Sequence, residues 1–588
     1  MIDLSYPYDW REVIRNKIKY KKQLLSEKCD FLKKRIAILS GSTVGELKDV
    51  LELFLLNQGI EPEFYEGSYG RFFEDAVFEN PSLDKFQPDL IYIHTSVKNI
   101  DFPRVKTSES EVESFLEQTI SRFEKVWQEL EKKYSCPIIQ NNVEELPYRL
   151  FGNTDAVHKN GWIRFVWKLN EIFSEYARTH SNFFIDDIHW QSACVGFERW
   201  FDDKLWYLYK YPFSLEASCS VAFNLSNIVK SLYGKNKKAL ICDLDNTLWG
   251  GVIGDDGAEN IRLSREEPSG MPYYDLQKVL LNLFDMGVML NVCSKNDEDK
   301  ARAGLKHPNS VLQEDNFIYF VANWENKDLN ISSIIKSLNI MPDAAVFLDD
   351  NPMERELVKA GNPDVEIPVF DRPENYVKTL LNASYFEVTG LSDEDKKRNS
   401  YYISDKKRKF AKADFTDYES YLKSLKMKTT IRQVNEKNLG RFVQLVNKTN
   451  QFNMTGIRIT EEELRKMLNS SENIVLTADL SDKFGDNGIV SCLFAKKTSE
   501  AIQIINWVMS CRVFKRDLEK AVFDYLVDRC FKSKLKEIRG EVVKTKKNAF
   551  CQSIYSELGF SLSESSMWIY EIGETYTPKN TVMEVEYE

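Results

Sequence analysis

The chain has 588 residues, too many for one hydrophobic core, and a prior of roughly 150 residues per domain predicts three or four folded units. An apolar fraction of 43% supplies side chains for packed cores and excludes a largely disordered chain. The net charge of −11 disfavours a general nucleic-acid binder, because no basic surplus exists to neutralise phosphates.

The cysteines and the N-terminus indicate the compartment. The 10 cysteines include no Cys-x-x-Cys pair, so neither a zinc site nor a disulfide framework is indicated, and a reducing cytoplasm fits. The first residues mix charges and aromatics, unlike a secretory signal, and no window reaches the roughly 18 uncharged apolar residues of a membrane span. We expect a cytoplasmic protein with neither a membrane nor a nucleic-acid partner.

Strand-like apolar runs alternate with amphipathic helical stretches along residues 1–232, which is typical of a parallel α/β domain. A second unit, of Rossmann-like layout, follows at residues 236–390. In the first unit the expected strands are 35–40, 89–94 and 137–140, and the expected helices are 45–58 and 110–132. In the second unit strands are expected near 237–242 and at 288–293, 317–322 and 344–348.

The remainder of the chain predicts a linker and a third domain. Residues 391–427 are strongly charged and favour an exposed helix with a linker. Residues 428–588 mix the two kinds of element, with strands expected at 501–509 and 536–543 and helices at 517–531 and 547–558. The predicted class is therefore α/β, with three domains.

Two aspartates follow the first strand of the second unit, in the stretch CDLDNTLWGGVIGDDG at residues 242–257. Polar side chains just beyond the carboxyl end of a buried parallel strand project into the crevice where ligands bind. Asp243 and Asp245 are therefore placed for one carboxylate to attack while the other transfers protons, and Thr247 adds a hydroxyl. The alternative is a strand-terminating turn rich in Asp and Asn.

Later strand ends favour the catalytic interpretation. The strand at 288–293 is followed by Ser294, a hydroxyl donor for a phosphate oxygen. The strand at 344–348 is followed by Asp349 and Asp350, acidic ligands suited to Mg²⁺. Lys327, between them in the chain, is placed to neutralise a phosphate during attack.

This order of elements, over residues 237–390, resembles the four motifs of the haloacid-dehalogenase (HAD) superfamily. The resemblance implies that Asp243 is a nucleophile forming an aspartyl-phosphate, and that Asp245 protonates the leaving group and then activates water. It also implies that Thr247, Ser294 and Lys327 hold the phosphoryl group. Mg²⁺ would lie between the Asp243 carboxylate, the Asp245 backbone carbonyl and one carboxylate of the Asp349–Asp350 pair.

The spacing of these residues bears on the substrate. About 50 residues separate Asp243 from Ser294, and about 33 separate Ser294 from Lys327, too few for a large cap domain. We therefore expect a core with a minimal cap, in which the Trp249–Gly251 turn is a small flap over an open site. A large partner, or a flexible arm carried by one, can reach such a site.

Further motifs are spread over nearly the whole chain. They are DLDNTLWGGVIGDDG (243–257), VCSKND (292–297), FLDDNPMERE (347–356), PIIQNN (137–142), LWYLYKYPFS (205–214), KTNQFNMT (448–455), GDNGIV (485–490), MSCRV (509–513) and KKNAFCQSIYSELGF (546–560). Together they resemble the FkbH-like family, also called HAD subfamily IIIC. The resemblance implies transfer of a glyceryl unit from 1,3-bisphosphoglycerate, a small phosphorylated metabolite, to an acyl carrier protein thiol with removal of phosphate.

Two other functions remain open. One is a phosphatase acting on a sugar or polyol phosphate in surface-glycan biosynthesis, which no sequence feature separates from glyceryl transfer. The other is a non-catalytic scaffold with a vestigial HAD core, and the intact residues at all four strand ends speak against it.

Loading of a thioester requires a thiolate, either on the carrier's phosphopantetheine or on an enzyme cysteine that acts first. Cys293, directly before Ser294, and Cys511, at a strand end in the third domain, are the candidates. The alternative for each cysteine is a small buried apolar residue.

The third domain resembles the GNAT (acyl-CoA N-acyltransferase) fold, in which a glycine-containing loop offers backbone N–H groups to the CoA pyrophosphate. Here the corresponding loop, residues 512–517, lacks both glycines, which disfavours acetyl-CoA binding, although Lys515 and Arg516 suit one phosphate of a phosphopantetheine arm. Asn548 and Tyr555 match the second motif of that fold. Tyr555 is either a general acid toward a thiolate or a packed core residue.

The first domain resembles SGNH hydrolases. Ser42 follows the first strand, where such enzymes keep their nucleophile, and Asp186 and His189 have the Asp-x-x-His spacing of the other triad members. A clear oxyanion block is lacking, and small Ser or Thr residues after a strand commonly cap the next helix. A carrier-docking or substrate-holding role is the alternative to hydrolysis.

Overall fold

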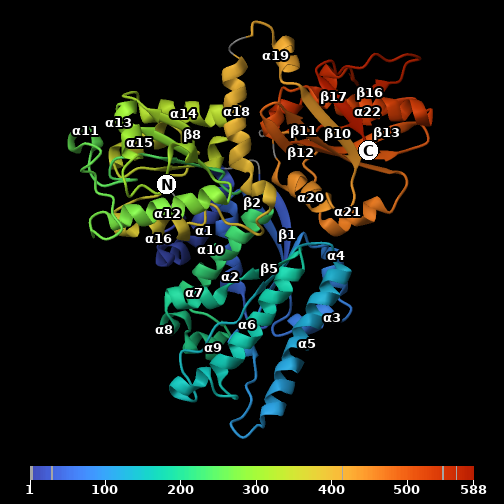
Figure 1. The fold of residues 1–588 in the computed structure, drawn as a ribbon. Helices are drawn as coiled ribbons and strands as arrows, with labels where there is room; N and C mark the ends of the chain where they lie inside the picture. Colours follow the sequence, from blue (N-terminus) through green and yellow to red (C-terminus); the bar gives the residue numbers. More distant parts are fainter. Residues whose placement is uncertain (1–3, 28–30, 413–414, 450, 546–547, 565) are drawn as a thin grey trace. The chain divides into compact units, whose positions relative to one another are not determined.

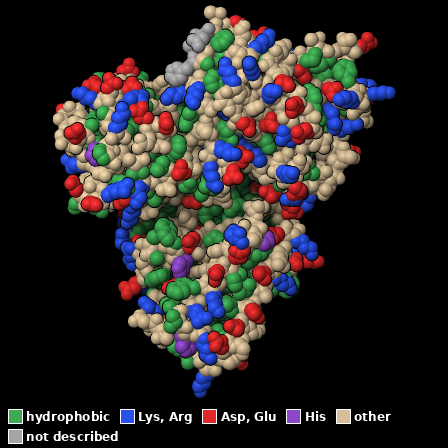
Figure 2. All heavy atoms as spheres, in the orientation of Figure 1, with side chains coloured by type: hydrophobic (Ala, Val, Ile, Leu, Met, Phe, Trp, Pro, Cys, Tyr) green, Lys and Arg blue, Asp and Glu red, His purple; other side chains and the backbone are tan. Residues whose placement is uncertain are grey.

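The computed structural model describes residues 4–27, 31–412, 415–449, 451–545, 548–564 and 566–588. The chain divides into two compact units, Met1–Leu232 and Tyr233–Glu588 (Figure 1). No helix of the described residues has the length and apolar character that crossing a membrane requires. On the face drawn in Figure 2, acidic and basic side chains are interspersed rather than gathered by sign.

The first unit is built on a parallel five-stranded sheet with helices packed around it (Figure 1). Its strands are β1 (Leu32–Ser40), β2 (Ile60–Glu66), β3 (Leu90–His94), β4 (Ile138–Asn141) and β5 (Phe183–Asp186), in the order β2-β1-β3-β4-β5. Its helices are α1 (Trp10–Glu27), α2 (Gly45–Asn57), α3 (Phe72–Val77), α4 (Pro81–Phe86), α5 (Glu109–Lys133), α6 (Trp162–Thr179), α7 (Ile188–Val195), α8 (Phe197–Trp200), α9 (Asp203–Tyr209) and α10 (Leu215–Leu232).

The predicted strands of this unit correspond to β1, β3 and β4, and the predicted helices to α2 and α5. Helix α5 begins at a capping box in which Ser108 and Glu111 satisfy each other's backbone N–H groups. Strand β2 was not predicted, because its sequence IEPEFYE alternates apolar residues with acids and proline at a sheet edge.

Residues 236–390 form a four-stranded parallel sheet in the order β8-β7-β6-β9. Its strands are β6 (Ala239–Cys242), β7 (Met289–Ser294), β8 (Phe317–Ala322) and β9 (Ala345–Leu348). Its helices are α11 (Ile253–Asp256), α12 (Met271–Asp285), α13 (Glu298–Gly304), α14 (Lys327–Leu338), α15 (Pro352–Gly361) and α16 (Tyr376–Asn382). All four strands were predicted, and the α/β class is confirmed.

The last part of the chain carries an eight-stranded mixed sheet, in the order β15-β16-β14-β13-β12-β11-β10-β17. Its strands are β10 (Met427–Gln433), β11 (Asn473–Asp482), β12 (Gly485–Lys497), β13 (Ala501–Met509), β14 (Glu537–Gly540), β15 (Ser561–Leu562), β16 (Trp568–Glu571) and β17 (Met583–Tyr587). Its helices are α19 (Tyr418–Ser424), α20 (Leu439–Lys448), α21 (Glu461–Leu468), α22 (Leu518–Ser533) and α23 (Ile554–Glu557).

The prediction of one helix at 547–558 is wrong for the described part of that range. A short 3-10 turn (Ala549–Cys551) precedes α23, and residues 546–547 lie outside the described residues. The Asn548 amide donates to the carbonyls of Asn453 (3.1 Å) and Val543 (2.9 Å), which ties the start of the segment to two other stretches of chain.

The charged segment at 391–427 was expected to be an exposed helix with a linker; the helix is present, but part of its surface is packed. Helices α17 (Asp393–Lys396) and α18 (Arg398–Lys412) precede α19 here, and α18 packs against both β8 and β12 (Figure 1). Its Tyr402 and Ile403 contact the core of residues 236–390. On another face Arg408, only 2% exposed, donates to both carboxylate oxygens of Asp482, at 2.7 and 2.9 Å. The partner lies 74 residues away, so the charge pattern alone gave no sign of it.

Candidate active site

The carboxyl end of the β8-β7-β6-β9 sheet gathers the predicted phosphotransfer residues. Asp243 follows β6, Ser294 ends β7, Asp349 follows β9 and Lys327 opens α14 after β8. Parallel strands end at the same edge, so residues that are up to 106 positions apart meet there. All four side chains are buried, with no more than 6% exposed.

Lys327 holds the two central carboxylates together. Its Nζ lies 2.6 Å from Asp349 Oδ2 and 3.1 Å from Asp243 Oδ1. Burial lowers the pKa of Lys327, but the two carboxylates outweigh burial and raise it overall. Burial and the charge of Asp243 raise the pKa of Asp349 to about 7. The site therefore holds one buried ammonium among closely spaced carboxylates.

Three carboxylates are close enough to share a metal ion. Oxygens of Asp243, Asp349 and Asp350 all lie within 4.8 Å of one another. Both oxygens of Asp349 are already engaged, Oδ2 by Lys327 and Oδ1 by the Asn351 N–H at 2.8 Å. Burial, and then the charge of Asp243, raises the pKa of Asp350. Oxygen-rich, negatively charged clusters of this kind suit Mg²⁺.

Arg355, which sequence reasoning missed, fixes the loop that carries this acidic pair. Its Nη1 donates to the backbone carbonyls of Asp349 (2.8 Å) and Asp350 (2.7 Å). Thr247, predicted to bind phosphate, accepts the Asp350 N–H at 3.2 Å and is fully buried. Thr247 and Arg355 thus hold the two sides of one loop, and the only sequence signal for Arg355 was its place one turn into the following helix.

Asp245 is held by the turn that follows it. Its Oδ1 accepts hydrogen bonds from Trp249 Nε1 (2.8 Å) and the Ile253 N–H (3.1 Å), and its Oδ2 accepts one from Asn296 Nδ2 (2.9 Å). Asn296 also donates to Ser294 Oγ, at 3.2 Å. The carboxylate orientation is therefore set by the flap on one side and by the loop after β7 on the other.

The flap itself depends on glycine. Gly250 pairs with Arg262 through two backbone hydrogen bonds of 3.0 and 2.7 Å, which close residues 250–262 into a small lobe. A Cβ on Gly250 would lie 2.7 Å from the Tyr273 ring, and Gly251 has a φ of +100°, so neither position accepts another residue without rearrangement. Trp249 is completely buried beneath this lobe.

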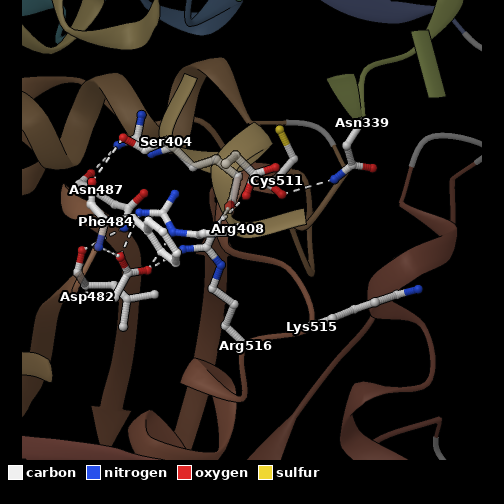
Figure 3. Close-up of polar contacts among 12 residues, drawn as sticks. Asn339, Ser404, Arg408, Asp482, Phe484, Asn487, Cys511, Lys515 and Arg516 are labelled. Carbon is white, nitrogen blue, oxygen red and sulfur yellow. Dashed lines mark hydrogen bonds and ion pairs between the residues drawn. The ribbon is translucent and has the colours of Figure 1, made fainter. Parts of the chain in front are cut away.

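Of the two candidate cysteines, Cys293 lies beside the predicted phosphate site, where its Sγ donates to the Lys327 carbonyl at 3.9 Å, and Cys511 lies away from it. Cys293 is fully buried in an apolar cluster, and burial raises the pKa of its thiol to about 12, so a thiolate is disfavoured. The carbonyl of Cys511 accepts a hydrogen bond from Asn339, at 3.0 Å (Figure 3). Asn339 follows the last residue of α14 and Lys327 is its first. A helix of 12 residues is about 18 Å long, which places Cys511 at the far end of α14 from Lys327.

The glycine-free loop after β13 is used for internal contacts. Arg516, 6% exposed, reaches Asp405 of α18 at 2.7 Å and Asp482 at 3.4 Å, beside Arg408 (Figure 3). Lys515 points away from this cluster in Figure 3, and it is exposed. Arg516 is therefore neutralised by carboxylates of its own chain, which opposes the predicted phosphate contact at that residue.

The gap where β13 and β14 diverge is filled by the protein itself. The two strands pair only along Ala501–Ile504 of β13. Beyond that point the segment 452–454 lies beside β13, where the Met454 N–H donates to the Trp507 carbonyl (3.1 Å) and the Met509 N–H donates to the Phe452 carbonyl (3.1 Å). The N–H of Val543 closes the other side by donating to Met454 O at 2.8 Å. Any ligand that needs this gap would have to displace the chain.

The two motif residues of this region are both buried. Asn548 is 2% exposed and bridges the chain carbonyls named above. Tyr555 is fully buried, packs on the Phe560 ring, and has its pKa raised by burial. Of the two roles predicted for Tyr555, the packed core residue fits this environment.

The predicted triad of the first unit is not assembled. Asp186 accepts hydrogen bonds from Tyr92 (3.0 Å), Gln191 (2.9 Å) and Asn224 (2.7 Å). Within the described part of the chain no hydrogen bond joins Ser42, Asp186 and His189, although the Ser42 hydroxyl and His189 Nδ1 are buried without a partner. The acceptors of Asp186 are thus taken by other donors, and the triad stays a prediction that this geometry does not support.

A comparison with protein families gives one match, within the first unit. Residues 35–230 are similar to the family described as FkbH, N-terminal domain. The comparison with curated proteins gave no match.

Solved structures bear on the rest of the chain. The N-terminal part of a Bacteroides fragilis protein, which contains a phosphatase domain and was crystallised with Mg, is 28% identical, covers 65% of this chain and 100% of its own, and has a TM-score of 0.59. Together with the FkbH N-terminal domain, this HAD-like phosphatase fold supports an enzyme of phosphatase type.

N-acetyltransferases also align, but weakly. The ribosomal-protein-S18-alanine N-acetyltransferase of Escherichia coli is 14% identical, and a GNAT-family acetyltransferase of Streptococcus pneumoniae is 18% identical. Each covers 25% of this chain and 99% of its own, with a TM-score of 0.20. Scores at this level carry no conclusion about the last part of the chain.

Proposed function

We propose that residues 236–390 form an Mg²⁺-dependent phosphotransfer site in which Asp243 is the nucleophile. The main support for this proposal is that the Lys327 ammonium lies within 3.1 Å of carboxylate oxygens of both Asp243 and Asp349 at one edge of the sheet. A largely buried carboxylate beside a fixed ammonium is positioned to attack phosphorus while the ammonium stabilises the developing charge.

Asp245 is assigned the proton transfers. Two donors from the flap and one from Asn296 leave its carboxylate oriented but not charge-paired. It would give a proton to the leaving oxygen and then take one from the water that hydrolyses the aspartyl-phosphate. Ser294, whose Oγ lies beside Asn296, would donate to a phosphoryl oxygen.

The acidic cluster fits a divalent cation. Asp243 and Asp350 would be its carboxylate ligands, because both oxygens of Asp349 are already engaged, and the Asp245 backbone carbonyl is assigned by the HAD resemblance. When bound, Mg²⁺ would offset the negative charge of the phosphoryl group and orient it toward Asp243. The Mg in the Bacteroides fragilis structure is consistent with this assignment.

We further propose that the substrate is a phosphoglyceryl donor and that the acyl unit passes to the thiol of an acyl carrier protein. The FkbH N-terminal domain match supports this choice, and a large cap is absent between the described strands β6 to β9. Because Cys293 is buried and Cys511 lies at the far end of α14, the carrier thiol is the acceptor we favour. A phosphatase acting on a sugar or polyol phosphate is the alternative.

One assay separates these functions. The protein is incubated with Mg²⁺, 1,3-bisphosphoglycerate and candidate holo-carrier proteins; intact carrier mass and released phosphate are then measured. A glyceryl mass gain supports transfer, and phosphate release with no gain on any carrier favours the phosphatase. No phosphate release by the wild type from acyl or ester phosphates contradicts the proposed site.

The nucleophile is tested by Asp243→Asn, which removes the attacking charge with little change in shape. Phosphate release should be abolished, and retained turnover would contradict the assignment. Asp255→Asn is the matched control, because Asp255 is an exposed carboxylate of the lobe at residues 250–262 and lies outside the three-carboxylate cluster. It should keep wild-type turnover.

A further inference from the structure

Arg262 is an exposed cation at the closing end of the lobe at residues 250–262. Its backbone is fixed by two hydrogen bonds to Gly250, at 3.0 and 2.7 Å, and Gly250 directly follows Trp249, whose indole donates to Asp245. A Cβ on Gly250 would lie 2.8 Å from Arg262 Nε, so the side chain runs back across this turn. The guanidinium therefore lies beside the turn that orients Asp245.

The Tyr273 ring links this guanidinium to the acidic cluster. The same Cβ on Gly250 would lie 2.7 Å from the Tyr273 ring, so ring and guanidinium are neighbours. Burial raises the pKa of Tyr273, the charge of Arg262 lowers it, and the charges of Asp350 and Glu374 raise it further. Arg262 and the proposed metal ligand Asp350 thus act on one phenol, which places them about one side chain apart.

The other cations around the reacting groups already have partners. Lys327 contacts two carboxylates, and Arg355 donates to two backbone carbonyls. On the loop and helix after β7, three cations pair with acidic residues at 2.7 to 3.5 Å: Lys295, Lys300 and Arg302. Within the described part of the chain no ion pair involves Arg262. Its guanidinium is therefore available to an anionic group of a substrate.

The overall charge of the lobe does not attract anions. Residues 250–267, the lobe and the turn that follows it, have a formal charge of −3 (two positive against five negative). The five carboxylates are exposed, so solvent and salt screen them. Arg265, the second cation of this stretch, lies over the Tyr274 ring, 5.2 Å from its centroid. A preference for an anionic group would therefore come from direct contact with Arg262 and not from the field of the lobe.

We propose that Arg262 determines substrate specificity by binding a second anionic group, on the part of the substrate that leaves from phosphorus. Asp245 is assigned to protonate the leaving oxygen, so the leaving part of the substrate lies near the turn beside Arg262. A guanidinium can form two parallel hydrogen bonds to a carboxylate or a phosphate. The site then prefers short phosphates with an anionic group at each end, as in the phosphoglyceryl donor proposed above. This inference rests on the proposed phosphotransfer function.

Two substrates that differ at one end test this inference. 3-Phosphoglycerate and glycerol 3-phosphate carry the same phosphate ester on a three-carbon unit, but only the first has a carboxylate at the other end. With Mg²⁺ present, Arg262→Gln should lower kcat/KM for 3-phosphoglycerate about tenfold, mainly through KM, and kcat/KM for glycerol 3-phosphate less than about twofold. Added salt should reduce the preference of the wild type for 3-phosphoglycerate and leave that of the variant unchanged.

Two further variants show whether the guanidinium at this position is responsible. Arg262→Lys keeps the charge but not the planar fork, so it should recover part of the loss. Arg265→Gln is the matched control, because Arg265 is an exposed guanidinium three residues away, and it should keep both kcat/KM values of the wild type. Equal losses for both substrates in Arg262→Gln, no loss for 3-phosphoglycerate, or the same loss in Arg265→Gln would overturn the inference.

Binding separates this inference from the proposed function. Calorimetry on the Asp243→Asn protein with Mg²⁺ should show tighter binding of 3-phosphoglycerate than of glycerol 3-phosphate, and Arg262→Gln should remove the difference. If the wild type releases phosphate from neither substrate but this difference in binding is present, the proposed chemistry fails and the assignment of Arg262 stands. If the difference is absent, or survives in Arg262→Gln, the assignment of Arg262 fails.

Discussion

The buried charges around Lys327 make a quantitative prediction about Lys327→Met. Three carboxylates and one ammonium give this cluster a formal charge of −2 (one positive against three negative). Lys327 is 3% exposed, so solvent compensates little for its loss. Methionine keeps an unbranched apolar side chain but removes the cation that lies 2.6 Å from Asp349 and 3.1 Å from Asp243.

Removing one partner of a buried ion pair leaves an uncompensated charge, which typically costs about 3 to 5 kcal/mol. At pH 8 the wild-type Asp349 carboxyl, whose pKa is about 7, is mostly ionised beside Lys327, so loss of the cation should cost the variant about 3 kcal/mol of local stability. Mg²⁺ should restore part of it. A ligand at about ten times its Kd stabilises by about 1.4 kcal/mol, and the more negative variant cluster should gain more from the cation than the wild type does.

Amide hydrogen exchange of β6 and β9, at pH 8 with and without about 10 mM Mg²⁺, measures these local free energies. Lys295→Met is the matched control, because Lys295 pairs with Glu354 at 2.7 Å but is 32% exposed, and it should lose less than about 1 kcal/mol. If Lys327→Met loses less than about 1 kcal/mol of local stability, and Mg²⁺ stabilises it no more than the wild type, Lys327 does not compensate the buried carboxylates.

Other predictions follow from single contacts. Trp249→Phe keeps a buried ring but removes the donor to Asp245, so kcat should fall about tenfold with KM nearly unchanged, and an unchanged kcat would contradict the orienting role. Burial raises the pKa of Glu144 from 4.5 to about 7, so the stability of β3 and β4 should be complete below pH 4.5 and fall by about 3 kcal/mol as pH rises to about 7. In Glu144→Gln, hydrogen exchange should show a smaller fall of stability with rising pH than in the wild type. An equal fall in the variant would argue against the role of Glu144. Arg408→Met should weaken β11 and β12 by about 1 to 2 kcal/mol, because buried Asp482 loses its two-bond partner but keeps Arg516 at 3.4 Å, and unchanged exchange there would oppose this.

Local sequence patterns predicted the features that depend only on neighbouring residues, such as strands and the residues at their ends. The apolar runs at 317–322 and 501–509 coincide at both ends with β8 and β13, because each is bounded by polar residues. Asp243, Ser294 and Asp349 were found for the same reason, since each stands at the end of such a run. The phosphotransfer interpretation of this edge came from the sequence.

Contacts across long sequence distances were beyond these patterns. The carboxylate of Asp245 is oriented by Asn296, 51 residues later, and nothing near Asn296 announces that role. Asp186 was assigned to a triad by its spacing from His189, but Gln191 and Asn224 donate to its Oδ1 and Tyr92 donates to its Oδ2. Sequence spacing limits which residues can come together, but it does not determine which of several competing hydrogen-bond partners a side chain binds.

The amino-acid sequence by itself determined the α/β class and the strand-end residues of the proposed phosphotransfer site, because strand periodicity and the polar residues that interrupt it are local properties. The tertiary structure decided what surrounds them. It buried Cys293 in the core, placed Cys511 at the far end of α14, and left the Arg262 side chain exposed beside the turn that orients Asp245. Burial and charge pairing depend on elements that are distant in the chain, and only folding brings those elements together.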